Sequence, residues 1–320
     1  MPHLRPSGLG NVPDPGAPPP GETPVPEPRA VPDRLWIIGP GRLGLALGLR
    51  LAETGAVGML AYSGRSTAAP AHPLFSHHPG LARYQAGLAA PPSPGTGVLI
   101  TVPDDALPGV AAALAKLDLP VELPILHASG SLSTDVLEPL ARRGNPVGGL
   151  HPLAAIADPV DGAERLRGAT FGVEGEGAAR ALAERIVAAC EGRVLRIQPG
   201  GKALYHAAAV FASNYAVALL SMAQRLMVRS GVGDLDARAA LTRLAAGAVE
   251  NVAARGTAAA LTGPIARGDA ETVARHLARL SGAERGVYSL LGREALELAA
   301  ARGLDAAAVE RLRSLLGEGE

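Results

Sequence analysis

The sequence of 320 residues contains one cysteine, Cys190, and aromatic residues make up 3% of it. A single cysteine excludes an intramolecular disulfide framework and fits a reducing compartment. The formal net charge is zero and there is no run of basic residues, which argues against nucleic acid or an anionic membrane as the main partner. No window of about 18 apolar residues suggests a membrane span, and the N-terminus lacks a signal pattern. These absences predict a cytoplasmic protein with a small-molecule partner.

Lysine is also scarce, since Lys116 and Lys202 stand beside 28 arginines. With 48% hydrophobic residues, the chain is long enough for two domains with cores. Residues 1–32 hold eleven prolines and are predicted to be a disordered tail. Beyond the tail, the residue pattern predicts an α/β domain over 33–198 and an all-α domain over 199–320.

The first of these domains is predicted to be a doubly wound parallel sheet of the Rossmann type, because strands and helices alternate along it. Strands are expected at 34–39, 57–62, 97–102, 124–128, 146–150, 169–174 and 193–198, with a short one near 83–85, and helices at 42–54, 104–117, 132–143 and 176–191. The segment 67–96 contains His72, His77 and His78 without cysteine or carboxylate partners at metal-ligand spacing. We therefore expect a surface loop there and no metal site.

The second domain is predicted to contain only helices, at 201–230, 234–255, 269–281, 283–302 and 305–316. Their alanine-rich faces suit close helix packing, and we expect a homodimer interface among them.

Residues 35–44 lead from an apolar strand into Gly-x-Gly-x-x-Gly and then into a helix, which is typical of a dinucleotide-binding turn. Gly39 permits the tight turn, Gly41 lets the backbone approach a diphosphate at the helix N-terminus, and Gly44 lets the helix pack closely on its strand. The alternative is a glycine-rich turn that binds nothing, and the flanking strand and helix argue against it. The predicted cofactor-binding residues are Gly39, Pro40, Gly41, Arg42, Leu43 and Gly44, joined by Val102, Pro103 and Asp104 after a later strand.

The end of the second strand distinguishes between two cofactors. An NAD site usually carries an acidic residue here, about 20 residues after the glycines, to bind the ribose 2′-hydroxyl. This chain has Ser63, Arg65 and Ser66 instead, and a guanidinium with two hydroxyls suits a 2′-phosphate. Although Arg65 could also be a solvated turn residue, the sequence favours NADP over NAD.

Further candidate residues follow later strands and the start of the second domain. Ser129 and His151 come just after strands, where an open α/β sheet binds its ligands. On a continuous helix starting at 201, Lys202, His206 and Ser213 would share one stripe, with Asn214 beside it. Arginine cannot give up its proton, so a lysine here points to proton transfer. A core histidine and an exposed first-turn lysine are the alternatives for His206 and Lys202.

Several motifs together resemble one family: Rossmann-like proteins with a C-terminal helical domain of unknown function, described as NADP oxidoreductases. The motifs are the glycine-rich turn, residues 63–66, His127-Ala128-Ser129-Gly130, Gly149-Leu150-His151-Pro152-Leu153, residues 199–206 and residues 262–269. The resemblance covers about 34–315 and extends to 6-phosphogluconate dehydrogenases, ketopantoate reductases, pyrroline-5-carboxylate reductases and prephenate dehydrogenases.

Those relatives imply roles for individual residues. Lys202 matches the catalytic lysine of β-hydroxyacid dehydrogenases and ketopantoate reductases, although His206 replaces their asparagine. Ser129 and His151 match the serine and histidine that meet the substrate hydroxyl in prephenate dehydrogenases, although Ala155 replaces a glycine of that motif. The expected catalytic residues are Lys202, His151, Ser129 and His206, and the expected substrate-binding residues are Ser213, Asn214, Thr262 and Arg267, with Arg267 paired to a carboxylate.

The resemblance implies that NADPH delivers hydride to the carbonyl of a small 2-oxo acid held between the domains, with ketopantoate as the most specific candidate. Lys202 or His151 would supply the proton. Two alternatives stay open: an imine reductase or a deazaflavin-linked NADP oxidoreductase, and an NADP sensor without turnover.

Overall fold

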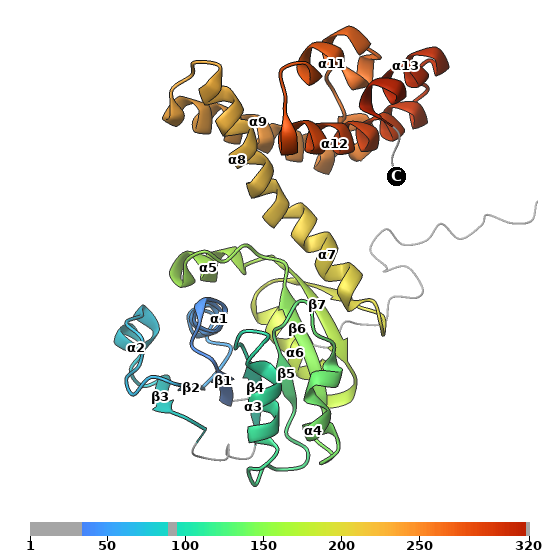
Figure 1. Ribbon diagram of the computed structural model, residues 1–320. Helices are drawn as coiled ribbons and strands as arrows, with labels where there is room; N and C mark the ends of the chain where they lie inside the picture. The colour runs from blue at the N-terminus through green and yellow to red at the C-terminus, as the bar shows by residue number, and fades with distance from the viewer. Residues whose placement is uncertain (1–33, 89–94, 318–320) are drawn as a thin grey trace, which may run out of the picture. The chain divides into compact units, whose positions relative to one another are not determined.

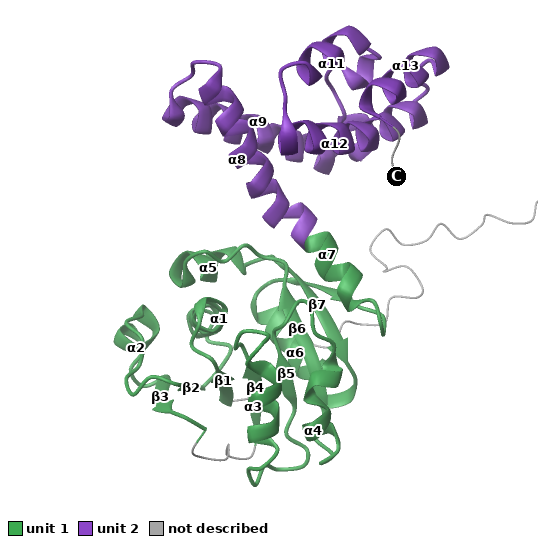
Figure 2. Ribbon diagram, viewed as in Figure 1, with its two compact units in different colours: residues 1–209 green, residues 210–320 purple. Residues whose placement is uncertain are grey.

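The structure is a computed structural model that describes residues 34–88 and 95–317, so the predicted tail 1–32 lies outside the described residues. The chain divides into two compact units, Met1–Ala209 and Val210–Glu320, coloured separately in Figure 2. The division falls inside helix α7 (Lys202–Ala212). The boundary expected from the sequence, at 198/199, lies just before that helix.

The described part of unit 1 is organised by an eight-stranded sheet with the order β3-β2-β1-β4-β5-β6-β7-β8 (Figure 1). The strands are β1 (Arg34–Ile38), β2 (Met59–Gly64), β3 (Ala82–Ala86), β4 (Thr96–Ile100), β5 (Ile125–His127), β6 (Val147–Pro152), β7 (Thr170–Gly175) and β8 (Arg193–Arg196). From β3 across to β6, neighbouring strands run parallel. The order reverses between β1 and β4, which confirms the predicted doubly wound fold.

Helices cover both faces of this sheet. They are α1 (Arg42–Glu53), α2 (Pro73–His77), α3 (Leu107–Leu114), α4 (Glu138–Ala141), α5 (Pro159–Arg165) and α6 (Gly177–Ala189), with a 3₁₀ turn η1 (Thr134–Leu137) before α4. The sequence reading missed α2 and α5. Helix α2 lies within the predicted loop 67–96, and His72 is its N-cap, since the Nδ1 atom accepts a hydrogen bond from the Leu74 amide at 3.2 Å. A capping histidine followed by Pro73 starts this short helix.

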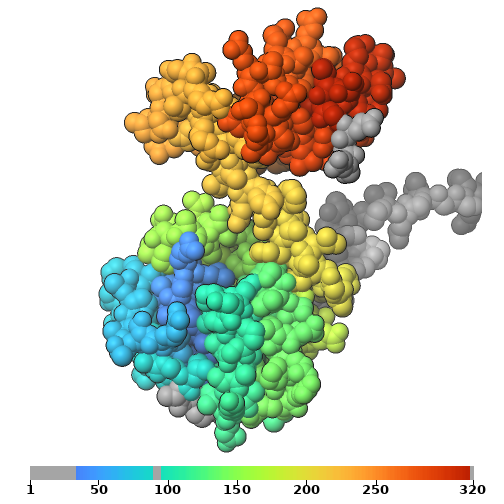
Figure 3. All heavy atoms as spheres, in the orientation of Figure 1, coloured from blue at the N-terminus to red at the C-terminus, as the bar shows by residue number. Residues whose placement is uncertain are grey.

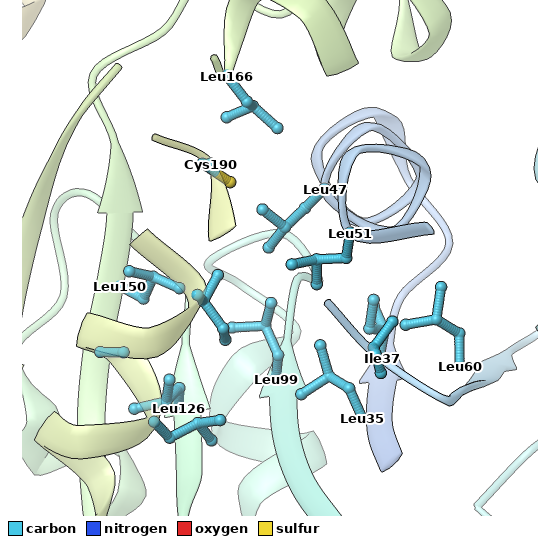
Figure 4. Close-up of a cluster of buried hydrophobic side chains, with 14 of the residues drawn as sticks. Leu35, Ile37, Leu47, Leu51, Leu60, Leu99, Leu126, Leu150, Leu166 and Cys190 are labelled. Carbon is cyan, nitrogen blue, oxygen red and sulfur yellow. The ribbon is translucent and has the colours of Figure 1, made fainter. Parts of the chain in front are cut away.

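Successive side chains of β1 point to opposite faces of the sheet and pack into a buried cluster on each face. Leu35 and Ile37 point to the face that packs against Leu47 and Leu51 of α1, as Figure 4 shows. Trp36 and Ile38 belong to a second buried cluster, on the opposite face, with residues of α3 and α4. A strand that is buried on both faces reads as a continuous apolar run, which is why the sequence located it.

Strand β7 departs from the predicted parallel sheet, because it pairs with β6 in the antiparallel sense. The connection between the two strands carries α5, a helix of seven residues that packs against α1. Figure 3 shows α5 in yellow-green against the blue α1. Because β7 is antiparallel to β6, the chain re-enters the sheet from the end at which β6 left it.

Unit 2 is entirely helical in its described part. Its elements are α8 (Asn214–Arg229), α9 (Asp234–Arg255), α10 (Thr257–Ala260), the 3₁₀ turn η2 (Ile265–Arg267), α11 (Ala270–Leu277), α12 (Gly282–Ala301) and α13 (Ala306–Leu316). The core gathers Val273 and Leu277 of α11, Leu296 of α12 and Leu312 of α13. Every residue of α8 is at least partly exposed.

The predicted helix 201–230 is wrong in one respect, since α7 ends at Ala212 and α8 starts at Asn214. Ser213 between them has a ψ of −70° with a φ of −116°, outside regular helix geometry. The predicted stripe of Lys202, His206 and Ser213 assumed a continuous helix. It therefore extends only to the end of α7.

Helices α7 and α8 contain a candidate membrane span, which the sequence analysis did not expect. Together they form Lys202–Arg229, 28 residues with a mean hydropathy of 1.4 in the most apolar window, and none of that window is buried. This stretch is long and apolar enough to cross a membrane by length and composition, which is weak support on its own. The sequence analysis did not identify this stretch as a candidate span, because serine, asparagine and glutamine interrupt its apolar residues.

Candidate functional site

A cavity of about 720 Å³ opens where β1, β2 and β4 end. These carboxyl ends meet at one edge because the strands are parallel. The lining residues come from the turns after β1, β2, β3 and β4 and from the start of α3: Ile38, Gly39, Pro40, Gly41, Ser63, Gly64, Arg65, Ser66, Gly87, Leu88, Thr101, Val102, Pro103, Asp105, Ala106 and Val110. This is the position at which doubly wound sheets bind dinucleotides.

Two glycines of the Gly-x-Gly-x-x-Gly motif are required by close approaches. Gly39 has a φ of +104°, and a Cβ atom there would lie 2.9 Å from the backbone nitrogen of Val102. A Cβ atom on Gly44 would lie 2.5 Å from the carbonyl oxygen of Gly39 and from the Thr101 hydroxyl. That hydroxyl donates to the Gly39 carbonyl at 2.6 Å. The turn after β1 is therefore locked against the turn after β4.

Helix α1 begins at this turn without a side-chain cap. The N-cap residue is Gly41, which has no side chain to accept a hydrogen bond from the first turn. No acidic residue is present in that turn. The first amides of a helix need acceptors, and an anion can provide them. Of the six predicted residues of this turn, Gly39, Pro40 and Gly41 line the cavity, while Arg42, Leu43 and Gly44 are not among its lining residues.

The three residues predicted to hold a 2′-phosphate divide into two kinds. Arg65 and Ser66 are exposed and line the cavity, and the Ser66 carbonyl is held by the Tyr84 hydroxyl at 2.6 Å. Ser63 is 1% exposed, and its hydroxyl accepts hydrogen bonds from Trp36 and Gln85 at 2.9 and 3.2 Å. The Ser63 side chain thus serves the core, and the guanidinium of Arg65 is the cation at this end of the cavity.

The turn after β4 contributes Val102 and Pro103 to the cavity, as predicted, but Asp105 in place of Asp104. The Asp104 carboxylate instead accepts a hydrogen bond from the Ser131 hydroxyl at 2.5 Å. This bond ties the turn after β4 to the turn after β5. Asp104 therefore faces a second group of polar residues.

This second group, called the His–Lys cluster below, consists of His127 of β5, His151 of β6, Glu174 of β7, and Lys202, Tyr205 and His206 of α7. All six residues belong to unit 1. Their elements are brought together by the sheet register, which pairs His127 with Gly149, Gly149 with Glu174, and His151 with Gly172. The first turn of α7 follows β8, and its residues Lys202 and Tyr205 contact Glu174 of β7 and His151 of β6.

Lys202 and Glu174 form a buried ion pair at the base of the cluster. The Nζ and Oε2 atoms are 2.7 Å apart, and the two side chains are 3% and 9% exposed. Gly149 allows this approach, because a Cβ atom there would lie 3.0 Å from Glu174 Oε2 and 3.4 Å from Lys202 Nζ. The alternative that Lys202 is an exposed first-turn residue is therefore wrong. The ammonium is buried because a carboxylate from a distant strand compensates its charge.

His151 lies between Tyr205 and His206. Its Nδ1 atom is 2.9 Å from the Tyr205 hydroxyl, and its ring centroid is 5.8 Å from that of His206. A Cβ atom on Gly130 would lie 2.4 Å from His206 Nδ1 and 2.7 Å from His151 Nε2. The backbone of the turn after β5 thus passes directly beside both imidazoles.

Burial keeps two of these histidines neutral. Desolvation, reinforced by the positive charge of Lys202, lowers the pKa of His127 to about 4 and the pKa of His151 to about 4. Desolvation raises the pKa of Tyr205 to about 12, and Glu174 adds to that shift. At neutral pH the cluster therefore holds two neutral imidazoles and a protonated phenol around one ion pair.

Ser129 sits beside the cluster but its hydroxyl is engaged in its own turn. The Oγ atom accepts hydrogen bonds from the amides of Ser131 and Leu132 at 3.2 and 2.9 Å, and the Ser129 amide donates to His127 Nδ1 at 3.2 Å. The serine thereby shapes the turn that faces His151 and His206. Its hydroxyl hydrogen is still available to a ligand, since accepting bonds does not use it.

The four predicted substrate-binding residues belong to unit 2, whereas the cluster residues belong to unit 1. Ser213, Asn214, Thr262 and Arg267 are all exposed. Arg267 closes the 3₁₀ turn η2, just before Asp269 caps helix α11. Their role in substrate binding stays a prediction.

Sequence reasoning missed three members of the cluster: His127, Glu174 and Tyr205. His127 and Tyr205 lie within motifs that carry the family resemblance, but neither was given a role. Glu174 gave no local signal, because its partner Lys202 lies 28 residues away. In the cavity, Leu88 and Asp105 were likewise missed.

Comparison with known proteins gives one family match, which begins just before β7 of unit 1 and ends in α12 of unit 2. Residues 169–295 match the model of a domain of unknown function (DUF2520). Among curated proteins, none matches this chain in sequence.

Several solved structures share the fold. Protein TM1727 from Thermotoga maritima is 23% identical, with a TM-score of 0.65 over 84% of this chain and 99% of that chain. The "putative NADP oxidoreductase" BF3122 from Bacteroides fragilis is 21% identical, with a TM-score of 0.65 over 83% and 98%. A Plasmodium falciparum pyrroline carboxylate reductase, solved with NADP bound, is 15% identical, with a TM-score of 0.53 over 90% and 100%.

These matches confirm the resemblance inferred from the motifs, to Rossmann-like proteins with a helical domain of unknown function. The chain has a Rossmann fold, and its residues 169–295 are similar to the DUF2520 family model.

Proposed function

We propose that this protein is an NADP(H)-dependent oxidoreductase that reduces the carbonyl group of a small 2-oxo acid. The observation that carries the proposal is that a dinucleotide-type cavity and a cluster of proton-carrying side chains lie at one edge of one sheet. The Asp104–Ser131 hydrogen bond joins the turns that border them. A binding protein without turnover needs the cavity but has no use for the cluster.

The residues of the cavity fit NADP. The uncapped amides at the start of α1 suit a diphosphate, and the glycines leave room for it. Arg65 and Ser66 line the cavity at the end of β2, where no carboxylate is present to select a free 2′-hydroxyl. The names of two structures with the same fold mention NADP, which supports NADP as the cofactor.

When bound, the nicotinamide supplies or accepts hydride. This chain's own residues then have to handle a proton and a negative charge. His151 is neutral and half-buried, so it can donate a hydrogen bond to a carbonyl oxygen and pass on its proton. Lys202 forms an ion pair with Glu174 and acts as a fixed positive charge behind His151. This role differs from that of proton donor, which the sequence left open for Lys202. Ser129 and His206 border the same space and orient the substrate.

Ketopantoate is the most specific substrate we propose, on the resemblance of Lys202 to the lysine of ketopantoate reductases. Imine reduction is the second candidate, and the shared fold with pyrroline carboxylate reductases favours it. The cluster fits carbonyl reduction better, because an alkoxide needs a proton whereas an iminium substrate already carries one.

A spectrophotometric assay with NADPH decides between these activities. The panel contains ketopantoate, pyrroline-5-carboxylate and other 2-oxo acids, with prephenate and NADP⁺ tested in the reverse direction. Turnover of a 2-oxo acid supports the proposal, and turnover of pyrroline-5-carboxylate alone supports imine reduction. Tight NADPH binding without turnover of any compound would favour a sensor.

We also propose that two copies associate through α8 and α9, as the sequence predicts for a homodimer. The apolar side chains Val217, Leu244 and Val249 are 68%, 71% and 69% exposed in the single chain, and such surfaces usually have a partner. Charges of both signs accompany them, with Arg225 on α8 and Glu250 on α9. A second copy can place these charges at a solvated rim, whereas a bilayer core would reject them.

Light scattering after gel filtration tests this association. The wild type should be a dimer, and Val217→Asp combined with Leu244→Asp should be a monomer. Val121→Asp is the control, since Val121 is 59% exposed but lies in unit 1. A monomeric wild type, or a wild type recovered with lipid vesicles, would refute the proposal.

A further inference from the structure

Tyr205 contacts His151 through its hydroxyl group. Its hydroxyl lies 2.9 Å from His151 Nδ1 and 3.4 Å from the His151 carbonyl oxygen. The rings stand edge to face, with centroids 5.7 Å apart and an interplanar angle of 86°. Tyr205 is thus aimed at the side of the imidazole opposite Nε2.

Two acceptors lie within reach of the Tyr205 hydroxyl: His151 Nδ1 at 2.9 Å and the His151 carbonyl oxygen at 3.4 Å. We infer that the hydroxyl hydrogen goes to the nearer acceptor, which is Nδ1. A neutral imidazole that accepts at Nδ1 carries its hydrogen on Nε2.

Glycine at position 172 is necessary for this arrangement. A Cβ atom there would lie 2.5 Å from the Tyr205 hydroxyl oxygen and 2.6 Å from Cζ. The antiparallel register of β7 brings this glycine opposite His151. The phenol therefore reaches His151 through a gap that a larger residue would close.

Within the described residues, no hydrogen bond engages His151 Nε2. The atom lies beside Gly130 and His206 Nδ1, and His206 Nδ1 is buried without a partner. Nε2 is thus left for a ligand that enters between the turn after β5 and helix α7.

We propose that Tyr205 is a positioning and relay residue: it fixes His151 in the Nε2–H tautomer and supplies the proton that His151 passes to the substrate oxygen. The inference rests on the proposed reductase function. As the substrate carbonyl becomes an alkoxide, the oxygen takes the proton of Nε2–H and Nδ1 takes the hydroxyl proton of Tyr205. After the product leaves, the Nδ1 proton returns to the phenolate and Nε2 takes a proton from solvent, which restores the phenol and the Nε2–H tautomer.

The charges around the pair suit this transfer. Lys202 Nζ lies 5.9 Å from the centroid of the Tyr205 ring, close enough to stabilise a transient phenolate. Glu174 opposes it but is neutralised in the ion pair. The other groups that face His151 are His206 of α7, His127 of β5 and Asp104 of the turn after β4. Burial and Lys202 disfavour an imidazolium, which is why the proton must come through the ring from Tyr205.

The chain contains a matched control for this pair. In unit 2 the Tyr288 hydroxyl lies 2.9 Å from His276 Nδ1, with ring centroids 5.8 Å apart and an interplanar angle of 89°. The local geometry is the same, but this pair lies outside the His–Lys cluster. Tyr288→Phe therefore removes the same hydrogen bond without touching the proposed site.

The first experiment needs no substrate. Nitrogen-15 NMR of the imidazoles in the full chain, assigned with His151→Gln, should show His151 as the Nε2–H tautomer with Nδ1 hydrogen-bonded. Tyr205→Phe should release Nδ1 and mix the tautomers, and Gly172→Ala should do the same by displacing the phenol. Tyr288→Phe should leave the His151 signals unchanged. An Nδ1–H tautomer in the wild type, or His151 signals that Tyr205→Phe does not move, would overturn the proposal.

The second experiment measures the relay on whichever carbonyl substrate the panel identifies. Tyr205→Phe should lower kcat by about 10- to 100-fold with little change in KM, since a relayed proton matters in the transition state. The proton inventory in mixed H₂O and D₂O should change from curved to linear, and Tyr288→Phe should resemble the wild type. An unchanged kcat in Tyr205→Phe would refute the relay. If the panel yields no turnover, the reductase function fails, while the tautomer experiment still decides the role of Tyr205.

Discussion

The dinucleotide cavity and the His–Lys cluster lie at the same edge of one sheet, yet they are built in opposite ways. The cavity is made largely of backbone and small residues, with exposed Arg65 and Ser66 at one end. The cluster is made of side chains, and His127 and Lys202 within it are 0% and 3% exposed. The cavity offers backbone amides without side-chain acceptors to a ligand, whereas the charges of Lys202 and Glu174 in the cluster neutralise each other.

This difference predicts what substitutions will do. A change in the cavity should alter binding and leave the fold intact, because its polar groups face solvent. A change in the cluster should alter stability as well as chemistry, because it leaves a buried charge or a buried donor without a partner. The single tryptophan, Trp36, is buried in unit 1, so its fluorescence reports the unfolding of that unit.

The largest effect is expected from Glu174→Ala. Lys202 would be left as a buried charge without a partner, which should lower the free energy of unfolding of unit 1 by about 3–5 kcal/mol. Urea unfolding followed by Trp36 fluorescence measures it. The double variant Glu174→Leu with Lys202→Met removes both charges and should recover most of the loss. A single variant as stable as the wild type would show that the ion pair is not isolated from water.

Arg65→Ala should act on cofactor affinity alone. The wild type is expected to bind NADPH more tightly than NADH, by about 1.5–3 kcal/mol for charge-assisted contacts, or one to two factors of ten. The variant should lose that preference and keep its stability. Fluorescence titration with both cofactors measures it, and Arg83→Ala, an exposed arginine on β3 outside the cavity lining, is the control. Equal wild-type affinities for the two cofactors would contradict the assignment.

The two regions also differ in how far the sequence predicted them. The cavity depends on local patterns: a glycine-rich turn between strand and helix, and the residues that follow β2 and β4. These were found because each turn lies within a few residues of its strand. Asp105 lines the cavity where Asp104 was predicted, because the choice between neighbouring residues depends on backbone direction, which no pattern records.

The cluster could be predicted only in part. His151 and Lys202 were singled out by their places after a strand and at a helix start, but the burial of Lys202 depends on Glu174. Glu174 reaches it because β7 is antiparallel to β6, and no pattern in the sequence marked that reversal. The break at Ser213 was missed as well, since alanine-rich sequence on both sides continues the helical pattern.

Acid should weaken the cluster before it affects the cavity. His127 has a folded pKa of about 4, against about 6.5 in an unfolded chain. The unfolded state therefore binds more protons between these values, and stability falls as the pH drops through that window. His127 alone should cost about 2 kcal/mol between pH 7 and pH 5, where most carboxylates stay ionised.

Urea unfolding by Trp36 fluorescence at pH 7, 6 and 5 measures this dependence. His151 also has a folded pKa of about 4, so His127→Asn removes one of two titrating groups and should reduce the pH dependence by about half, with His276→Asn in unit 2 as the control. A wild-type stability that stays constant down to pH 5 would show that His127 is protonated without cost in the folded state.

Ser63→Ala is expected to have the smallest effect, and it tests the boundary between the two regions. Ser63 lines the cavity, but its hydroxyl is the acceptor for the buried indole of Trp36 and for Gln85. Removing that acceptor should lower the stability of unit 1 by about 1–2 kcal/mol. The ratio of NADPH to NADH affinity should stay nearly constant, because Arg65 carries the preference. Ser66→Ala, in the exposed part of the same turn, should show the reverse: unchanged stability and a small loss of preference. If Ser63→Ala instead abolished the preference for NADPH at unchanged stability, its hydroxyl would belong to the ligand and not to the core.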